Sequence, residues 1–241
     1  MKKSGKIALV IGGSGGIGSA IASRLILDGF KVYSTYYKNS PIKKLKNINY
    51  LKCDLLNESD IKNIINLITN DSQYIDVVVF SVSPEIKNTR ILDLSVKDIE
   101  LHFKIQVLSF IKLIQLLKPQ FDNKYKTKII NVLTEYCIGK PPKGVAAYLT
   151  AKSALLGLSK VLSLELAESK STVNMISPGM VETKLIENLP KKLIEMTAYN
   201  NPLKKIASAE DIANVISFLA SNDSDYLNGV NIPINGGNVQ F

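Results

Sequence analysis

Residues 6–18 read KIALVIGGSGGIG, a short apolar run followed directly by a turn packed with glycine. The run predicts a buried strand, and the apolar residues after it recur at helical spacing over residues 17–28. The glycines between fit both G-x-G-x-x-G and G-x-x-x-G-x-G, patterns that turn tightly and let backbone approach a pyrophosphate. A helix that opens in such a turn points its positive end at the phosphates. We therefore expect a dinucleotide site formed by Gly12, Ser14, Gly15, Gly16, Ile17 and Gly18.

The rest of the chain alternates strand and helix patterns with short connections. Further strands are expected at residues 31–36, 50–53, 75–80, 128–133, 172–176 and 229–234, and further helices at 58–69, 96–117, 148–168 and 209–220. The helix at 96–117 is expected to stop before Pro119. This alternation predicts an α/β fold, a doubly wound parallel sheet of the Rossmann type with helices on both faces. No repeat or linker divides the chain, so we expect a single domain over residues 1–241.

Composition is that of a globular protein. The 241 residues are 46% hydrophobic and 21% charged. No apolar run approaches the roughly 20 residues that span a bilayer, and the basic start lacks the apolar region of a signal peptide. Cys53 and Cys137 are too few for a disulfide framework and are interpreted as free thiols in a reducing compartment. We expect a cytoplasmic protein with no membrane partner.

The net charge of +9 comes from basic residues scattered along the chain. No predicted helix clusters them among aromatic residues, so we expect no nucleic-acid partner. A basic surface suits an acidic small ligand, such as a phosphorylated cofactor, or an acidic carrier protein.

Tyr148 and Lys152 lie four residues apart in a predicted helix and therefore share a face. An ammonium beside a phenol stabilises phenolate and lowers the phenol pKa from its reference of about 10. Taken alone, the pair is common by chance and is more typical of an exposed helical surface. With the glycine turn upstream, it predicts proton transfer by Tyr148 beside a nicotinamide.

The end of the second strand bears on the choice of cofactor. An NAD site has an acid there, which accepts from the ribose 2′-hydroxyl. Residues 34–40 read STYYKNS, with Tyr36 at the position of the acid and Lys38 nearby. A 2′-phosphate would be tolerated and could be bound by Lys38, so we expect NADPH (NADP+) in preference to NADH. The alternative is that Lys38 is a solvated loop lysine.

Asp54 is expected at the adenine side, or alternatively as the N-cap of the next helix.

These residues resemble the short-chain dehydrogenase/reductase family over essentially the whole chain, and the bacterial 3-oxoacyl-[acyl-carrier-protein] reductases in particular. Besides Tyr148 with Lys152, the matching stretches are residues 12–18, 53–55, 174–183 and 228–237. The resemblance implies that residues 178–183 contact the nicotinamide carboxamide and the diphosphate. The further cofactor contacts that it implies are Leu55, Pro178, Gly179, Val181 and Thr183.

Three positions depart from the family pattern. The family's Asn-Asn-Ala-Gly after the fourth strand is FSVS at residues 80–83, so Ser81 must serve the adenosine side differently. The catalytic Asn aligns with Gln106, whose amide is one methylene further out. The catalytic Ser aligns with Thr134, although the usual spacing to the tyrosine lands on Glu135. We expect Thr134, because the chemistry requires a hydroxyl.

The resemblance implies that NADPH gives hydride to a carbonyl and that Tyr148 protonates the alkoxide. Lys152 then holds the nicotinamide ribose, Thr134 bonds the carbonyl oxygen, and Gln106 holds a water relay. The expected substrate is a 3-oxoacyl thioester or related ketone, small or tethered to a carrier. Residues 180–205 are expected to form a substrate lid, including Ile186, Leu189, Leu193 and Met196; core packing is the alternative.

Two other functions remain open. One is an oxidoreductase for a sugar or a secondary-metabolite ketone, and the other is a cofactor-binding module with altered catalysis.

His102, the only histidine, is expected at the surface or an interface, away from the motifs. Apolar residues cover more than one face of the helices at 96–117 and 148–166, so we expect the surplus to meet a partner; a deeper core or contact with neighbouring helices is the alternative. The resemblance implies a homotetramer or homodimer built on these two helices.

Overall fold

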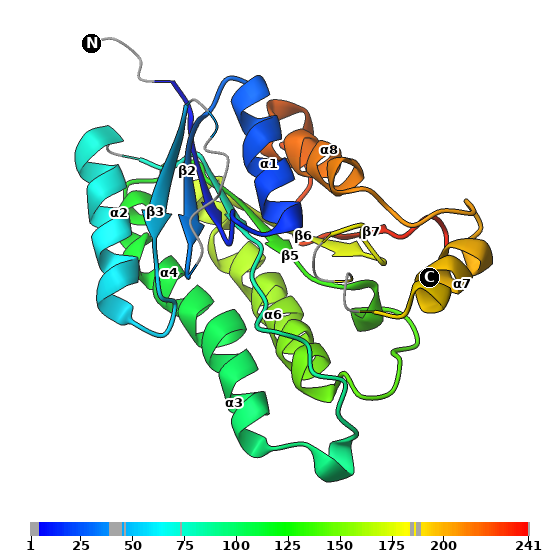
Figure 1. Ribbon diagram of the computed structural model, residues 1–241. Coiled ribbons are helices and arrows are strands. Elements are labelled where there is room, and N and C mark those ends of the chain that lie inside the picture. Colours follow the sequence, from blue (N-terminus) through cyan, green and yellow to red (C-terminus); the bar gives the residue numbers. More distant parts are fainter. Residues whose placement is uncertain are drawn as a thin grey trace.

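The computed structural model describes residues 5–38, 45, 47–72, 74–183, 186 and 189–240. Within these residues, seven strands form one parallel sheet in the order β3-β2-β1-β4-β5-β6-β7 (Figure 1). The strands are β1 (Ile7–Ile11), β2 (Lys31–Tyr36), β3 (Ile48–Lys52), β4 (Val77–Phe80), β5 (Lys128–Val132), β6 (Thr172–Pro178) and β7 (Asn231–Ile234). The direction of strand addition reverses between β1 and β4, the place where open α/β sheets bind ligands.

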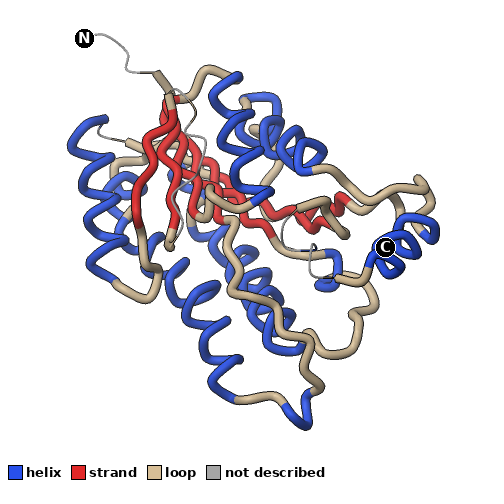
Figure 2. The backbone as a smooth tube through the Cα atoms, viewed as in Figure 1, coloured by secondary structure: helices blue, strands red, loops and turns tan. Residues whose placement is uncertain are grey.

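Helices cover both faces of this sheet, as Figures 1 and 2 show. On one face, α1 (Gly16–Leu27) and α8 (Ala209–Ala220) pack against the side chains of Ala8 and Val10. On the other, α2 (Glu58–Ser72), α4 (Ser109–Leu116) and α6 (Ala146–Glu165) pack against Leu9 and Ile11. Successive residues of β1 thus serve opposite cores. The doubly wound fold is confirmed, while the single-domain organisation over 1–241 stays a prediction.

The helical region expected at residues 96–117 is divided. It consists of α3 (Val96–Phe103), a π-helical turn η2 (Lys104–Leu108) and α4, followed by a short helix α5 (Lys118–Asp122). Helix α4 ends before Pro119, as expected, but the chain stays helical beyond it. Pro119 lies in the first turn of α5, where a missing backbone N–H costs nothing.

The remaining elements are short. They are α7 (Lys191–Asn200) and the 3₁₀ turns η1 (Ile91–Asp93), η3 (Glu135–Cys137), η4 (Ala167–Ser169) and η6 (Asn222–Ser224). No helix among the described residues is long and apolar enough to cross a membrane. Because all the strands are parallel, the segments that follow β1, β4, β5 and β6 leave the sheet at the same end, the carboxyl edge, where the strands have their carboxyl termini. That edge gathers the residues predicted to be functional.

Candidate active site

The turn after β1 requires glycine because other backbone passes very close to it. Gly12 has a φ of 83°, and its N–H donates to Thr35 Oγ1 at 3.0 Å. A Cβ on Gly18 would lie 2.2 Å from the Gly12 carbonyl oxygen, and a Cβ on Gly13 would lie 2.0 Å from Ser34 Oγ. The helix therefore starts directly against the turn, as the glycine pattern predicts.

Helix α1 presents an uncompensated N-terminus at this turn. Its N-cap, Gly15, makes no side-chain cap hydrogen bond, and its first turn contains no acidic residue. Ser14, Gly15 and Gly16 are exposed. Backbone N–H groups and the positive end of the helix dipole are therefore available to an anion such as a pyrophosphate.

Thr183 lies against this turn, although it is far away in the sequence. A Cβ on Gly16 would be 2.6 Å from Thr183 Cγ2. Two backbone contacts just before Thr183 fix its segment. The Gly179 N–H donates to the Ile234 carbonyl, and Val181 forms a β-bridge with Ala207. Val181 itself is buried in the core, so only its backbone can face a cofactor.

The end of β2 carries no acid among residues 34–38. Tyr36 is partly buried, and Lys38 is exposed, with its Nζ 5.5 Å from the ring centre of Tyr37. Residues 39 and 40 lie outside the described part of the chain. Lys38 is thus exposed to solvent, and residues 34–38 contain no carboxylate beside it.

Asp54 does not cap the helix that follows it. Its Oδ1 accepts from the Leu56 N–H at 2.9 Å, closing a local turn. Asn57 performs the capping role, accepting from the Ser59 N–H at 3.0 Å. Leu55 is partly buried against the core. The alternative role of Asp54 as an N-cap is therefore wrong.

The segment after β4 closes on the glycine turn through its backbone. The Ser81 N–H donates to Ile11 at 2.9 Å, and a Cβ on Gly12 would lie 2.3 Å from the Ser81 carbonyl oxygen. Phe80, which stands where the family has Asn, is fully buried, with its ring centre 5.2 Å from that of Phe110. An aromatic contact here replaces a polar support of the sheet.

Lys152 joins two strand ends. Its Nζ donates to the carbonyls of Val82 at 3.0 Å and Val132 at 2.7 Å, which follow β4 and end β5. The side chain is buried, and burial lowers its pKa to about 7. Its Nζ lies 5.9 Å from the ring centre of Tyr148. The predicted pair on one helix face is therefore present.

Thr134 contacts the Tyr148 phenol. A hydrogen bond from the Thr134 side chain lowers the pKa of Tyr148, but burial raises it by more, so the net pKa is above its usual value. The sequence predicts that Lys152 lowers the pKa of Tyr148, and the structure shows no such lowering. The physical reason is that Lys152 is buried too: its own charged form is disfavoured, so it stabilises phenolate less.

Glu135 points elsewhere. Its Oε2 accepts from Asn238 Nδ2 at 3.0 Å, and burial raises the pKa of its carboxyl. Of the two candidates for the family serine position, the structure brings Thr134 and not Glu135 to Tyr148.

His102 lies at the candidate site and not at the surface, so that prediction is wrong. It is 4% exposed, and its ring meets that of Tyr148 edge-on, with centres 6.2 Å apart. Gln106 is fully buried and hydrogen-bonds to His102, with Nε2 and Nδ1 2.8 Å apart. Helix α3 packs along α6, which is what brings His102 inward. The four-residue spacing of His102 and Gln106 was the one signal in the sequence that could have indicated this contact.

Comparison with known proteins shows the family to which the chain belongs. A family model described as enoyl-(acyl carrier protein) reductase matches residues 12–238. The 3-oxoacyl-[acyl-carrier-protein] reductase FabG of Rickettsia typhi is 33% identical over an alignment of 242 positions that covers 97% of each chain. The chain belongs to the short-chain dehydrogenase/reductase family. It is therefore an NAD(P)-dependent oxidoreductase of the type that interconverts alcohols and carbonyls.

Other members of the family are similar along the whole chain. Tropinone reductase-like 3 of Erythroxylum coca is 31% identical, covering 97% of this chain and 93% of that protein. The crystal structure of a short-chain dehydrogenase family protein from Francisella tularensis superposes with a TM-score of 0.86 at 28% identity, covering 98% of this chain and 99% of that one.

In this short-chain dehydrogenase/reductase, helix α7 of the expected lid stands away from the core, whereas Val181 of the same segment is buried in it. Helix α7 has no buried residue, and Leu193 and Met196 are 45% and 52% exposed. Core packing, the alternative for these two side chains, is therefore wrong. Ile186 and Leu189 are partly buried, whereas residues 184, 185, 187 and 188 lie outside the described part.

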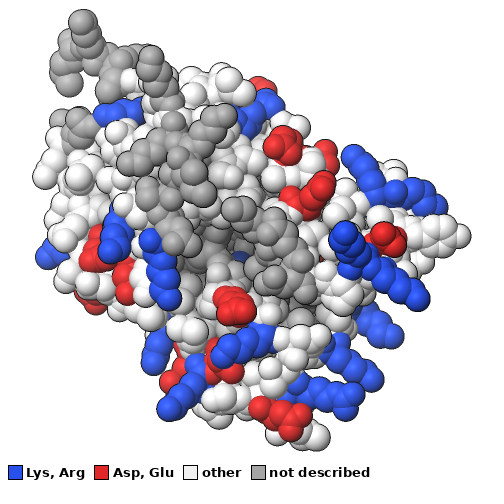
Figure 3. Space-filling model, in the orientation of Figure 1, with Lys and Arg blue, Asp and Glu red and all other residues white. Residues whose placement is uncertain are grey.

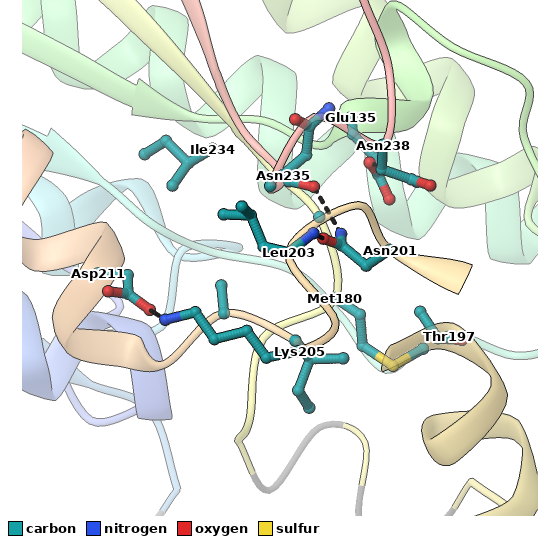
Figure 4. A pocket seen from close by; sticks show the side chains of 14 residues that line it. Glu135, Met180, Thr197, Asn201, Leu203, Lys205, Asp211, Ile234, Asn235 and Asn238 are labelled. Carbon is teal, nitrogen blue, oxygen red and sulfur yellow. Dashed lines mark hydrogen bonds and ion pairs between the residues drawn. The ribbon is translucent and has the colours of Figure 1, made fainter. Parts of the chain in front are cut away.

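A cavity of about 200 Å³ separates this segment from the end of the sheet (Figure 4). Met180 and Thr197 lie on one side of it and Ile234 on another, with Glu135 and Asn238 together at one end. Lys205 pairs with Asp211 at 3.7 Å along its wall. Neither Tyr148 nor Lys152 lines the cavity, whereas Glu135 and Gly179 do.

Proposed function

We propose that this enzyme reduces a ketone to an alcohol with NADPH, and that Tyr148 is the proton donor. The observation that carries the proposal is the convergence of Tyr148, Thr134 and Lys152. The glycine turn is linked to the same strand ends, since Gly12 contacts Ser81 and Lys152 holds the neighbouring Val82. These parts come from four separate segments of the chain.

The residues present fit a dinucleotide. The turn at residues 12–18 and the free N-terminus of α1 suit the pyrophosphate, with Thr183 beside them. NADPH, when bound, supplies hydride to the carbonyl carbon. The Tyr148 phenol then gives its proton to the developing alkoxide, while the Thr134 hydroxyl donates to the same oxygen. The Lys152 ammonium holds the two strand ends in place beside the phenol.

We propose a 3-oxoacyl thioester carried on an acyl carrier protein as the substrate. The similarity to 3-oxoacyl-[acyl-carrier-protein] reductases over nearly the whole chain supports it. Lysine and arginine side chains are also spread over several parts of the face in Figure 3, with fewer acidic ones between them. A surface with net charge +9 suits an acidic carrier. The similarity to a tropinone reductase-like protein supports an alternative, a ketone that is not bound to a carrier.

Replacement of Tyr148 by Phe tests the proposed proton donor. Tyr148→Phe keeps the ring and its packing but removes the acid, so turnover should fall by about a thousandfold or more. NADPH affinity should stay within about twofold, because the phenol is not what holds the cofactor. The measurement is NADPH oxidation over β-ketoacyl thioesters, sugars and simple diketones, with fluorescence titration of NADPH. Substantial activity in the variant would show that another group donates the proton.

The cofactor preference is a second part of the proposal. Tyr36 and Lys38 offer no carboxylate to repel a 2′-phosphate, so NADPH should bind at least severalfold more tightly than NADH. Tyr36→Asp should shift the preference toward NADH by repelling that phosphate. Fluorescence titrations of both cofactors measure this, with Tyr36→Asn as the uncharged control. Equal affinities in the unmodified enzyme would contradict the preference.

We further propose that the enzyme is cytoplasmic and forms a homodimer or homotetramer through α4 and α6. Cys53 and Cys137 are both free thiols, which suits a reducing compartment. Apolar side chains on α6 remain exposed, as at Val161 and Leu164.

A further inference from the structure

A buried polar pair lies directly behind the candidate proton donor. The His102 imidazole is 4% exposed, and the Gln106 side chain is fully buried. Their hydrogen bond, 2.8 Å long, joins Gln106 Nε2 and His102 Nδ1, and the imidazole meets the Tyr148 ring at 73°. A chain of contacts therefore runs from Gln106 through His102 to Tyr148.

The contacts of His102 determine which nitrogen carries its proton. The imidazole also hydrogen-bonds to the backbone of Glu85, and a backbone carbonyl can only accept. The nitrogen facing Glu85 therefore carries the proton, which leaves Nδ1 as an acceptor for the Gln106 amide. With its Nε2 donating to His102, Gln106 has its Oε1 buried and without a hydrogen-bond partner among the described residues.

The local backbone is adapted to this arrangement. Gln106 lies in the middle of the π-helical turn η2, Lys104–Leu108, which interrupts the region from α3 to α4. Single π turns are rare inside α-helices and are frequently found at functional sites. Gln106 is longer than the Asn of the family pattern, and its amide is folded back onto His102, one turn earlier.

Protonation of His102 would disturb this arrangement. An imidazolium has no acceptor nitrogen, so the Gln106 amide would have to reverse and present Oε1 to it. The added charge would face the Lys152 ammonium of α6 and, more remotely, Lys87, while Asp98 of α3 would partly offset them. Burial is the largest influence, and it lowers the pKa of His102 below its usual value of 6.5. Because the unfolded chain takes up this proton first, protonation makes the fold less stable as pH falls below about 6.5.

We propose that neutral His102 is a positioning residue for the reaction: it holds the Gln106 amide in one orientation, with Oε1 as the free acceptor, and braces the ring of Tyr148. The proposal rests on the proposed function, since it concerns proton transfer by Tyr148. Turnover then requires the neutral imidazole and falls when His102 is protonated.

Nuclear magnetic resonance can test the buried pair without any substrate. His102 is the only histidine among the 241 residues, so in protein prepared without a histidine tag every imidazole signal belongs to it. Long-range ¹H–¹⁵N spectra of ¹⁵N-labelled enzyme should show one tautomer, protonated at Nε2, that titrates below pH 6.5. Gln106→Leu should shift the Nδ1 resonance, because its hydrogen bond is removed. Averaged tautomers with an ordinary titration would overturn the proposal.

Two substitutions of His102 distinguish the role of its acceptor nitrogen from the role of its ring contact with Tyr148. His102→Asn keeps an acceptor near the Nδ1 position but does not titrate, whereas His102→Phe keeps a ring edge against Tyr148 but has no acceptor. At pH 7.5, His102→Asn should retain kcat within about threefold, and His102→Phe should lose about tenfold, the effect of one lost hydrogen bond. NADPH affinity should be unchanged in both.

The pH profile distinguishes positioning from a structural role. Wild-type kcat should fall only at a pH lower than 6.5, because burial lowers the pKa of His102, and that acid limb should disappear in His102→Asn. If His102→Phe matches the wild type in kcat and pH profile, the proposal is wrong. If instead the wild-type enzyme reduces none of the carbonyls tested, the proposed function fails, and the spectra of His102 still decide separately whether the neutral pair exists.

Discussion

At the scale of single residues, two neighbours at the end of β5 serve different contacts. The chain turns into η3 after Thr134, so consecutive side chains leave in different directions. Thr134 meets Tyr148, while Glu135 meets Asn238 near the C-terminal end of the described chain. A hydroxyl can donate to a carbonyl oxygen, and a carboxylate held by an amide away from Tyr148 cannot.

Substitutions at these two positions should therefore differ in effect. Thr134→Val removes the hydroxyl at nearly constant volume and should lower turnover about a hundredfold, the usual effect of losing one oxyanion donor. Glu135→Gln keeps size and hydrogen bonding and should change turnover less than about threefold. Steady-state kinetics with saturating NADPH measure both. The reverse order of effects would make Glu135 the group at the carbonyl.

At the scale of elements, the junction of β1 and α1 depends on close backbone approach. The Gly18 position has no room for a side chain, since its Cβ would meet the carbonyl oxygen of Gly12 at 2.2 Å. Gly15 differs, because the nearest atom to its Cβ would be at 3.7 Å and its φ is −76°. The two glycines of one motif are therefore required to different degrees.

Alanine at each position tests this difference. Gly18→Ala should lower the free energy of unfolding by about 1–3 kcal/mol and weaken NADPH binding, because the turn must open to admit the methyl group. Gly15→Ala should change stability by less than about 0.5 kcal/mol. Urea unfolding and NADPH titration of both variants provide the measurement. Equal losses of stability would mean that the turn is not the constraint.

At the scale of the whole molecule, α6 and the turn before α4 leave apolar surface uncovered. Val161 and Leu164 on α6 are 56% and 77% exposed, and Leu108 before α4 is 54% exposed. For a charge that tests the interface, Leu158 on α6 is less suitable because it is only partly exposed. Leu164 is therefore the better position for such a charge.

Leu164→Lys should reduce the assembly to a smaller species, because a charge buried at an apolar interface is not compensated. Leu27→Lys is the matched control: Leu27 is 82% exposed on α1, on the opposite side of the sheet, and the same change there should leave the mass unaltered. Light scattering at micromolar concentration measures both. A monomeric wild type, or equal effects of the two changes, would rule out the α4 and α6 interface.

Much of the fold and part of the site follow from short-range patterns. The strand at Lys31–Tyr36 and the helix at Ala209–Ala220 have the bounds that their periodicity predicts. The glycine turn and the spacing of Tyr148 and Lys152 are local as well, because neighbours in one turn or on one helix are neighbours in any fold. Such features depend on backbone geometry alone, and the sequence was sufficient for them.

Packing between distant segments determined the rest. His102 is a site residue because α3 lies along α6, and Lys152 has a pKa of about 7 because two strand ends enclose it. The π turn at Gln106 likewise has no periodic signature in the sequence. Burial and the approach of far-separated groups are properties of the assembled sheet and helices, and they set the charges and contacts on which the chemistry depends.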